Sequence, residues 1–242
     1  MATDVYERLA RHLDNLPPGY PSTGSGAELR ILRRLFSPQE AELAQHLTLI
    51  PEPARVVARR AKVPVEEAAQ RLEDMVEKRL VISSVREGYP TRYQASAFLV
   101  GFWEGQVDRL DLGLVQDFEE YLLAAFDADF WQKAPQLRTV PVGESISAQT
   151  EVMVHEQAEE LVRSHDSFAV ANCICRQEMH ILGEGCDKPL QSCLALGRAA
   201  ESTVRVGRAR ALSQEEAVML LRQAEETGLV LQPSNTQDAA FI

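Results

Sequence analysis

Apolar residues recur at helical spacing in the first part of the chain. After the segment "NLPPGYPSTGSGAE" (15–28), whose Pro, Gly and Ser content is typical of a linker, "AELRILRRLF" places an apolar residue at every third or fourth position. In "SPQEAELAQHL", Ser37 stands at an N-cap position, Pro38 at the first helical position and Glu40 where a capping box requires it. The pattern predicts two short helices.

The stretch from residue 51 to residue 96 predicts a helix, a turn, a longer helix and a hairpin. The turn falls at Lys62 to Pro64, the longer helix runs from Val65 to about Leu80, and "REGYPT" joins two extended runs. This order is typical of a winged helix-turn-helix, which we expect over residues 27–97 after an N-terminal helix and linker over 1–26. Its inward apolar set is Val56, Val57, Ala61, Ala68, Leu72, Met75, Val76 and Leu80.

Most aromatic residues follow directly, at spacings of three and four. They are Phe98, Phe102, Trp103, Phe118, Tyr121, Phe126, Phe130 and Trp131. Such a stripe is more often a packing seam between helices than a cofactor site. We therefore expect a helical connector over residues 98–136, whose aromatic face is also a candidate surface for a homodimer.

A second domain is expected over residues 137–242. "LRTVPVGESI" (137–146) predicts a short extended segment without chemistry of its own, "EQAEELVRSH" a helix, and "SFAVANCICR" a buried strand or extended entry. Further on, Ser213 and Glu216 fit a capping box, and Gly228 fits a helix stop. The predicted fold class is α+β and mostly helical, a winged helix-turn-helix module followed by a cysteine-motif metal-binding domain.

Composition and charge narrow the functional classes. The 242 residues suffice for an apolar core without disulfides, and the formal net charge is −11. The N-terminus carries acidic residues where a signal peptide needs a basic start, and no apolar run reaches membrane-spanning length. These features predict a soluble, cytoplasmic protein with no membrane span.

The acidic charge also disfavours nucleic acid as a partner, because the surface repels phosphates on average. The second helix of the predicted winged helix would be the one that reads DNA. It carries Glu66, Glu67, Glu73, Asp74 and Glu77, offset only in part by the basic "ARVVARRAK" before it. An interaction or packing role is favoured over DNA binding.

All four cysteines lie within "CICRQEMHILGEGCDKPLQSC", residues 173–193. In a reducing compartment, clustered cysteines are more often metal ligands or redox groups than disulfides. In an extended chain, Cys173 and Cys175 would present their thiols to the same side. Gly183 and Gly185 would let the spacer fold back and bring Cys186 toward that pair.

The surroundings of the cysteines favour ionised sulfur. Pro189 suits the first turn of a helix, with Cys193 one turn further in, and Arg176 and Lys188 supply positive charge near the thiols. These two cations would offset the charge of a bound centre. Four thiolates suit a tetrahedral zinc ion or a 4Fe-4S cluster. The spacing C-x-C-x10-C-x6-C matches neither common zinc knuckles nor the compact ferredoxin run, so the residues leave the metal open.

Other candidate residues are weaker. His180 in the spacer is an alternative ligand, although a histidine in a polar loop is more often a local hydrogen-bonding group. His155 and His165 flank the helix before the cysteines and receive the same interpretation. Four cysteines without metal remain an alternative to a bound centre. No pair of carboxylates stands out as a general acid and base, so an enzyme is less favoured than an electron-transfer or accessory protein.

Several segments resemble a known family. "RVVARRAK", "GYPTRYQASAFLVGFWEGQVDRLD", "SHDSFAVANCICRQEMHILGEGCDKPLQSCLALGRAAE" and "TGLVLQPSN" are similar to the amino-terminal region of 4Fe-4S-binding, ferredoxin-like proteins of bacteria and archaea. The resemblance extends from about residue 27 over nearly the whole chain. Its specific part is the C-I-C-R, G-x-G-C-D-x-P and C-L-x-x-G elements.

The resemblance implies that Cys173, Cys175, Cys186 and Cys193 are ligands of a 4Fe-4S cluster that serves electron transfer or redox coupling. In that family the equivalent of "QPSNTQDAAFI" leads into motifs for two further clusters, whereas this sequence ends at Ile242. We therefore expect a part of a longer ferredoxin-like protein, with a redox protein or an additional ferredoxin domain as partner. The alternatives are a zinc-stabilised interaction module without redox role and a cluster-sensing winged-helix transcription regulator.

Overall fold

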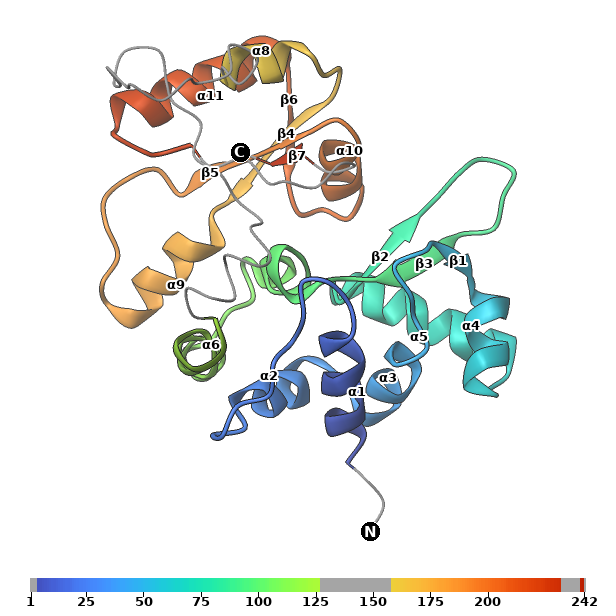
Figure 1. Ribbon diagram of the computed structural model, residues 1–242. Coiled ribbons are helices and arrows are strands. Elements are labelled where there is room, and N and C mark those ends of the chain that lie inside the picture. Colours follow the sequence, from blue (N-terminus) through green and yellow to red (C-terminus); the bar gives the residue numbers. More distant parts are fainter. Residues whose placement is uncertain (1–3, 127–157, 232–239, 242) are drawn as a thin grey trace, which may run out of the picture. The chain divides into compact units, whose positions relative to one another are not determined.

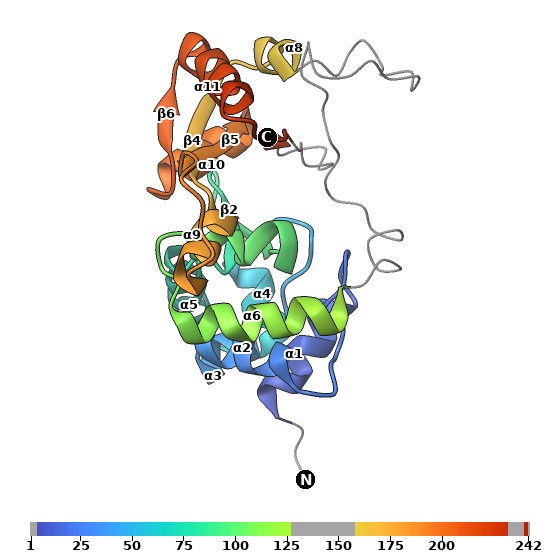
Figure 2. The same ribbon diagram turned by 90° about the vertical axis from the view of Figure 1, so that its left-hand side faces the viewer.

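The computed structural model describes residues 4–126, 158–231 and 240–241. The chain divides into two compact units, Met1–Ala134 and Pro135–Ile242, here called the N-terminal and C-terminal units. Each unit combines helices with one small antiparallel sheet, as Figures 1 and 2 show, so the predicted α+β, mostly helical class is confirmed. The predicted extended segment 137–146, like Phe130, Trp131 and His155, lies outside the described residues.

Helices dominate the N-terminal unit. Its elements are α1 (Val5–Asp14), α2 (Ala27–Leu35), α3 (Pro38–Ala44), β1 (Glu52–Pro53), α4 (Ala54–Ala61), α5 (Val65–Glu77), β2 (Val81–Ser84), β3 (Arg92–Ala95), the short turns η1 (Phe98–Phe102) and η2 (Glu104–Gln106), and α6 (Leu112–Ala125). The three strands form an antiparallel sheet in the order β1-β3-β2. Within the described ranges, no helix has the length and apolar character that a membrane crossing requires.

Local signals set the helix ends of this unit. The capping box predicted for α3 is present: the Ser37 hydroxyl accepts a hydrogen bond from the Glu40 N–H at 3.2 Å, and the Glu40 carboxylate accepts one from the Ser37 N–H at 2.8 Å. Helix α5 ends at Glu77, earlier than the predicted Leu80. Arg79 there adopts a left-handed conformation, which lets the Leu80 N–H close onto the Met75 carbonyl at 2.9 Å.

The apolar set expected between these elements is largely buried. Val57, Ala68, Leu72, Met75 and Leu80 are buried. Val56, Ala61 and Val76 are partly exposed, because they lie at the margins of the inward faces of α4 and α5.

Aromatic rings form a second part of the same core. Six of the eight residues of the predicted stripe are buried, and they pack with Tyr20 from the preceding linker; they are Phe98, Phe102, Trp103, Phe118, Tyr121 and Phe126. Trp103 stacks on Phe118 with ring centroids 3.7 Å apart and planes at 6°. These rings are thus covered within one chain, and a homodimer through this segment stays a prediction.

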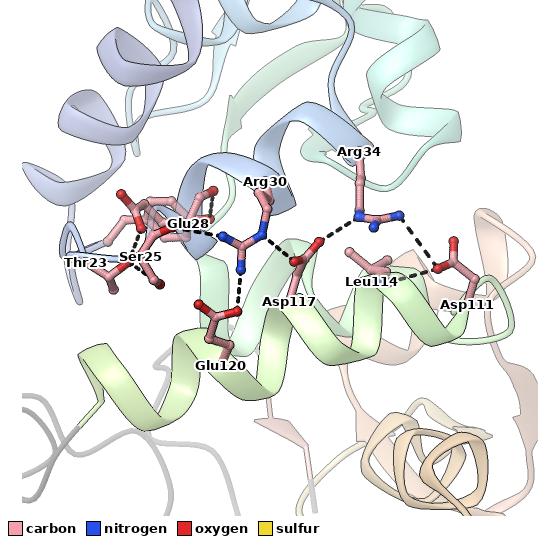
Figure 3. Close-up of polar contacts among 10 residues, drawn as sticks. Thr23, Ser25, Glu28, Arg30, Arg34, Asp111, Leu114, Asp117 and Glu120 are labelled. Carbon is pink, nitrogen blue, oxygen red and sulfur yellow. Dashed lines mark hydrogen bonds and ion pairs between the residues drawn. The ribbon is translucent and has the colours of Figure 1, made fainter.

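Charged side chains join α2 to α6. Asp117 of α6 is 8% exposed and lies between Arg30 and Arg34 of α2, as Figure 3 shows. Its two oxygens accept hydrogen bonds from the Nε atoms of these arginines at 2.6 and 2.7 Å. Arg30 also reaches Glu120. The contact fixes α6 against α2.

The C-terminal unit is built around a four-stranded sheet. Its elements are α8 (Ala158–Arg163), β4 (Phe168–Asn172), α9 (Ile174–Leu182), β5 (Gln191–Leu196), α10 (Arg198–Arg205), β6 (Arg210–Leu212), α11 (Gln214–Glu226) and β7 (Ala240–Phe241). All pairings are antiparallel, in the order β6-β4-β5-β7. The predicted buried strand before the cysteines is therefore present, and so is the capping box of Ser213 and Glu216 at the start of α11.

Alternation along β4 and β5 gives this sheet two apolar faces. On one face Phe168, Leu194 and Leu196 pack against α8 and α11. On the other face Ala169 and Ala195 pack against Ala199 and Ala200 of α10. The small residues of the second face allow α10 to approach the sheet closely. Cys193 lies two positions from Ala195 in β5 and so belongs to the α10 face.

Candidate metal centre

The cysteines lie where β4 leaves the sheet. Cys193 of β5 is paired with Ala171 of β4, and the register shifts directly after Ala171. The Cys173 N–H still donates to the Leu190 carbonyl at 2.8 Å, and the Cys173 carbonyl accepts from the Gln177 N–H at 3.1 Å. Cys173 is thus the residue at which the strand ends and α9 begins.

Two local predictions about this segment are wrong. Cys175 lies in the first turn of α9 rather than in an extended chain with Cys173, because the run "ICRQEMHIL" contains good helix formers and no second strand pairs with it. Cys193 lies in a strand rather than in a helix after Pro189. The buried run Leu194, Ala195 and Leu196 completes the ladder with β4, and this pairing overrides the local helix signal.

Three of the four sulfur atoms are nevertheless brought into contact. The Cys173 sulfur accepts hydrogen bonds from the thiols of Cys175 and Cys193, which lowers the pKa of Cys173. The main-chain N–H and the charge of Arg176 lower the pKa of Cys173 further. The pKa of Cys193 is raised, first by its hydrogen bond to Cys173 and then by burial. Cys173, Cys175 and Cys193 are here called the three-thiol group, in which the Cys173 sulfur is the hydrogen-bond acceptor.

Cys186 is held apart from the three-thiol group. It is exposed, and its sulfur accepts a hydrogen bond from Nη1 of Arg176 at 3.0 Å. The main-chain N–H of Lys188, followed by the Arg176 guanidinium, lowers the pKa of Cys186. Arg176 thus contacts one of the four cysteines directly, and its role in offsetting the charge of a bound centre stays a prediction. The ammonium group of Lys188 instead donates to the Thr227 carbonyl after α11, so Lys188 reaches Cys186 through its main chain.

The segment that carries Cys186 turns sharply after α9. Gly183 ends the helix with φ 81°, a left-handed conformation that favours glycine. The His180 imidazole packs against Gly185, where a Cβ would lie 2.5 Å from Cγ of the ring. His180 is thus a packing partner of the residue before Cys186. His165 bonds locally at the end of α8, with Nδ1 2.9 Å from the Leu161 carbonyl.

The donor chemistry of the site suits a soft metal, because thiolates are the preferred protein ligands of zinc and of iron–sulfur clusters. Within residues 4–126, 158–231 and 240–241, however, no group of three or more His, Cys, Asp or Glu side chains is arranged as a ready metal-ligand set. The four cysteines are all free thiols. Binding of a metal would therefore require the cysteines to rearrange, including Cys173, Cys175 and Cys193.

A groove lies on the α11 face of the same sheet, opposite Cys193. Its volume is about 500 Å³, and its lining comes from β4, the start of β5 with the two residues before it, β6 and α11: Val170, Pro189, Leu190, Gln191, Arg210, Leu212, Glu216, Met219, Leu220 and Gln223. No sequence motif marks it, because the lining residues are scattered over four segments and are of ordinary types.

Comparison of the chain with known proteins found no matching protein-family model, no matching curated protein and no matching solved structure.

Proposed function

We propose that the C-terminal unit binds a 4Fe-4S cluster through Cys173, Cys175, Cys186 and Cys193 and acts in electron transfer or redox coupling. The observation that carries the proposal is the contact of the Cys173 sulfur with the thiols of Cys175 and Cys193. These thiols come from a strand end, a helix start and a neighbouring strand, so three of the four candidate ligands lie near one another before any rearrangement. The sequence resemblance to 4Fe-4S-binding, ferredoxin-like proteins favours the cluster over zinc.

The residues around the sulfurs would favour the bound state. A 4Fe-4S cluster supplies one-electron chemistry when it is bound. Hydrogen bonds from Cys175 and Cys193 lower the pKa of Cys173, which favours the thiolate form that a metal binds. Arg176 lies beside both Cys173 and Cys186 and would offset the charge of four thiolates. Its guanidinium would thereby stabilise a reduced centre.

The main alternative is a zinc ion on the same four cysteines with no redox role. Anaerobic reconstitution with iron and sulfide, followed by metal analysis and electron paramagnetic resonance, separates the two. The cluster predicts a brown protein with a paramagnetic signal after reduction, and zinc predicts a colourless protein that incorporates no iron. The matched control is a variant in which Cys173 and Cys193 are replaced by serine, which should take up neither iron nor sulfide.

We also propose that the N-terminal unit contains a winged helix-turn-helix. The order α3-β1-α4-α5-β2-β3 and the antiparallel sheet β1-β3-β2 support it, because a wing is a hairpin that follows the second helix of the motif. The exposed face of α5 carries Glu66, Glu67 and Glu73, which favours a protein partner over DNA. Titration with duplex DNA at rising salt tests this, since true phosphate contacts would give a steep loss of affinity.

A further inference from the structure

The groove beside α11 leaves apolar surface open to solvent. Val170 of β4 and Leu212 of β6 line it from the sheet, and Leu220 of α11 lines it from the helix. Val170 is buried, whereas Leu212 and Leu220 are partly exposed. Met219 of α11 is 60% exposed although its side chain is large and apolar. The groove volume of about 500 Å³ lies within the range of small-molecule sites.

One end of the groove carries a guanidinium group. Arg210 of β6 donates from Nη1 to Oε1 of Glu216 at 3.1 Å. The other oxygen of Glu216 accepts the Ser213 N–H at 2.8 Å, and this main-chain bond, ahead of Arg210, lowers the pKa of Glu216. Within the described parts of the chain, Arg210 donates only from Nη1, to Glu216 and, at 3.5 Å, to the Ala211 carbonyl. The Nε and Nη2 atoms of Arg210 are therefore available to a ligand.

The groove is elongated along α11. Glu216 and Gln223 lie seven positions apart on this helix, which corresponds to about 10 Å along its axis. Met219 and Leu220 line the groove between them. The groove thus offers a guanidinium at one end, aliphatic side chains along its length and a neutral carboxamide, that of Gln223, two turns away.

We propose that this groove binds a medium-chain aliphatic carboxylic acid, with the carboxylate on Arg210 and the hydrocarbon chain along Leu212, Met219 and Leu220. A guanidinium with two free donors is matched by the two oxygens of a carboxylate. The apolar lining would cover the hydrocarbon chain, and the flexible methionine can adapt to its shape. The site uses none of the cysteines and is independent of the proposed cluster.

Glu216 sets a limit on the ligand and on its affinity. Its carboxylate offsets part of the Arg210 charge, so a second negative group on the ligand would be repelled. For the same reason we expect the contact between Arg210 and the ligand to contribute about tenfold in affinity, which is the low end for a hydrogen bond between charged groups. The ligand is therefore a monocarboxylate with an uncharged tail.

Calorimetric titration of the full chain with octanoate and with octanamide tests the carboxylate contact. Octanamide has the same hydrocarbon chain without the charge, so wild type should bind octanoate about tenfold more tightly. Arg210→Gln should bind both ligands alike, at the octanamide level. Arg222→Gln is the matched control, because Arg222 is an exposed arginine of α11 that pairs with Glu159 and does not line the groove. It should leave both affinities unchanged.

Methyl resonances of ¹³C-labelled methionine locate the bound chain. The Met219 signal, assigned with Met219→Leu, should shift with the same midpoint as the calorimetric titration, and that of Met75, which is buried in the N-terminal unit, should not. Circular dichroism would show that each variant is folded. The inference is overturned by the absence of saturable binding, by equal affinities of wild type for the two ligands, by a preference for octanoate that survives in Arg210→Gln, or by a Met219 signal that stays in place while octanoate binds. None of these results bears on iron uptake, so the proposed function is judged separately.

Discussion

The Arg176 guanidinium donates a hydrogen bond to the sulfur of Cys186 at 3.0 Å, although the two residues lie ten positions apart. The first turn of α9 directs Arg176 toward this sulfur, and the turn at Gly183 brings Cys186 back to meet it. One cation therefore lies beside both Cys173 and Cys186. This relationship makes Arg176 the side chain that should matter most for the charge of a bound centre.

Arg176→Met should lower the reduction potential of a reconstituted centre. Loss of a charge interaction of about 1 kcal/mol at a partly solvated site corresponds to roughly 40 mV for one electron. The oxidised form, which carries less negative charge, becomes the favoured one. Lys188→Met is the matched control, because its ammonium group is held by the Thr227 carbonyl and its main-chain N–H survives the change. Equal shifts in both variants, measured by protein-film voltammetry, would contradict the assigned contact.

The sequence predicted features that depend on short-range signals. The capping boxes of α3 and α11, the hairpin β2–β3 and the buried strand β4 are all present. The errors at Cys175 and Cys193 have a common cause, since both positions depend on which strand pairs with β4. Pairing between segments distant in sequence is not encoded locally, and a proline before an apolar run fits a helix start as well as a strand start. For the same reason, the sequence indicated only that Arg176 lies near the cysteines, and it did not predict the contact with Cys186.

Asp117→Ala should destabilise the N-terminal unit. The Asp117 carboxylate bridges Arg30 and Arg34, and its removal leaves two guanidinium groups side by side without their shared partner. Both arginine side chains are about two-fifths exposed, so solvent screens much of the effect. We expect a loss of about 1–3 kcal/mol in the free energy of unfolding.

Glu120→Ala is the control for this change, because Glu120 is half exposed and, among the described residues, forms an ion pair with Arg30 only. The Glu120→Ala variant should lose less than about 1 kcal/mol in the free energy of unfolding. Urea denaturation followed by tryptophan fluorescence measures both, since Trp103 stacks on Phe118 next to Asp117. Equal costs for the two variants would mean that the bridge between α2 and α6 carries no special stabilisation.

The N-terminal unit should lose stability in alkali. Burial raises the pKa of Tyr20 and of Tyr121 well above the ordinary value. The pKa of these tyrosines is higher in the folded chain than in the unfolded chain. Their neutral side chains therefore contribute fully to the free energy of unfolding below about pH 10, and this contribution is lost as the pH rises further. The free energy of unfolding should therefore fall steadily above about pH 10.

Tyr121→Phe tests this dependence. The variant loses the hydrogen bond from the Tyr121 hydroxyl to the Pro21 carbonyl, at a cost of about 1 kcal/mol near neutral pH. Above about pH 10 the difference in the free energy of unfolding between this variant and the wild type should become smaller, because the phenylalanine has no proton to lose. Tyr89→Phe, at a ring that is 57% exposed, should leave the alkaline slope unchanged. Parallel curves for wild type and Tyr121→Phe would refute the assignment to Tyr121.

Gly185→Ala should weaken metal binding while leaving the fold intact. A Cβ at Gly185 would lie 2.5 Å from Cγ of His180, so the imidazole has to leave its place and the segment before Cys186 loses this packing contact. Gly185 is exposed, which limits the effect on the free energy of unfolding to about 1 kcal/mol. Binding of Co²⁺ should weaken, because the segment that carries Cys186 is then less ordered and fixing it on the metal costs more conformational entropy.

The double variant His180→Ala, Gly185→Ala separates packing from backbone effects. If the collision with the ring is the cause, removing the ring gives the new methyl group room. The second substitution should then cost less metal affinity in the His180→Ala background than in the wild type. Gly183→Ala is the opposite control: its φ of 81° strains any side chain, yet no atom lies within 4 Å of the new Cβ. Gly183→Ala should lower the free energy of unfolding because it strains the backbone at the end of α9. Removal of the His180 ring should not reverse this loss. Additive effects of the two substitutions at His180 and Gly185 would show that the imidazole does not position Cys186.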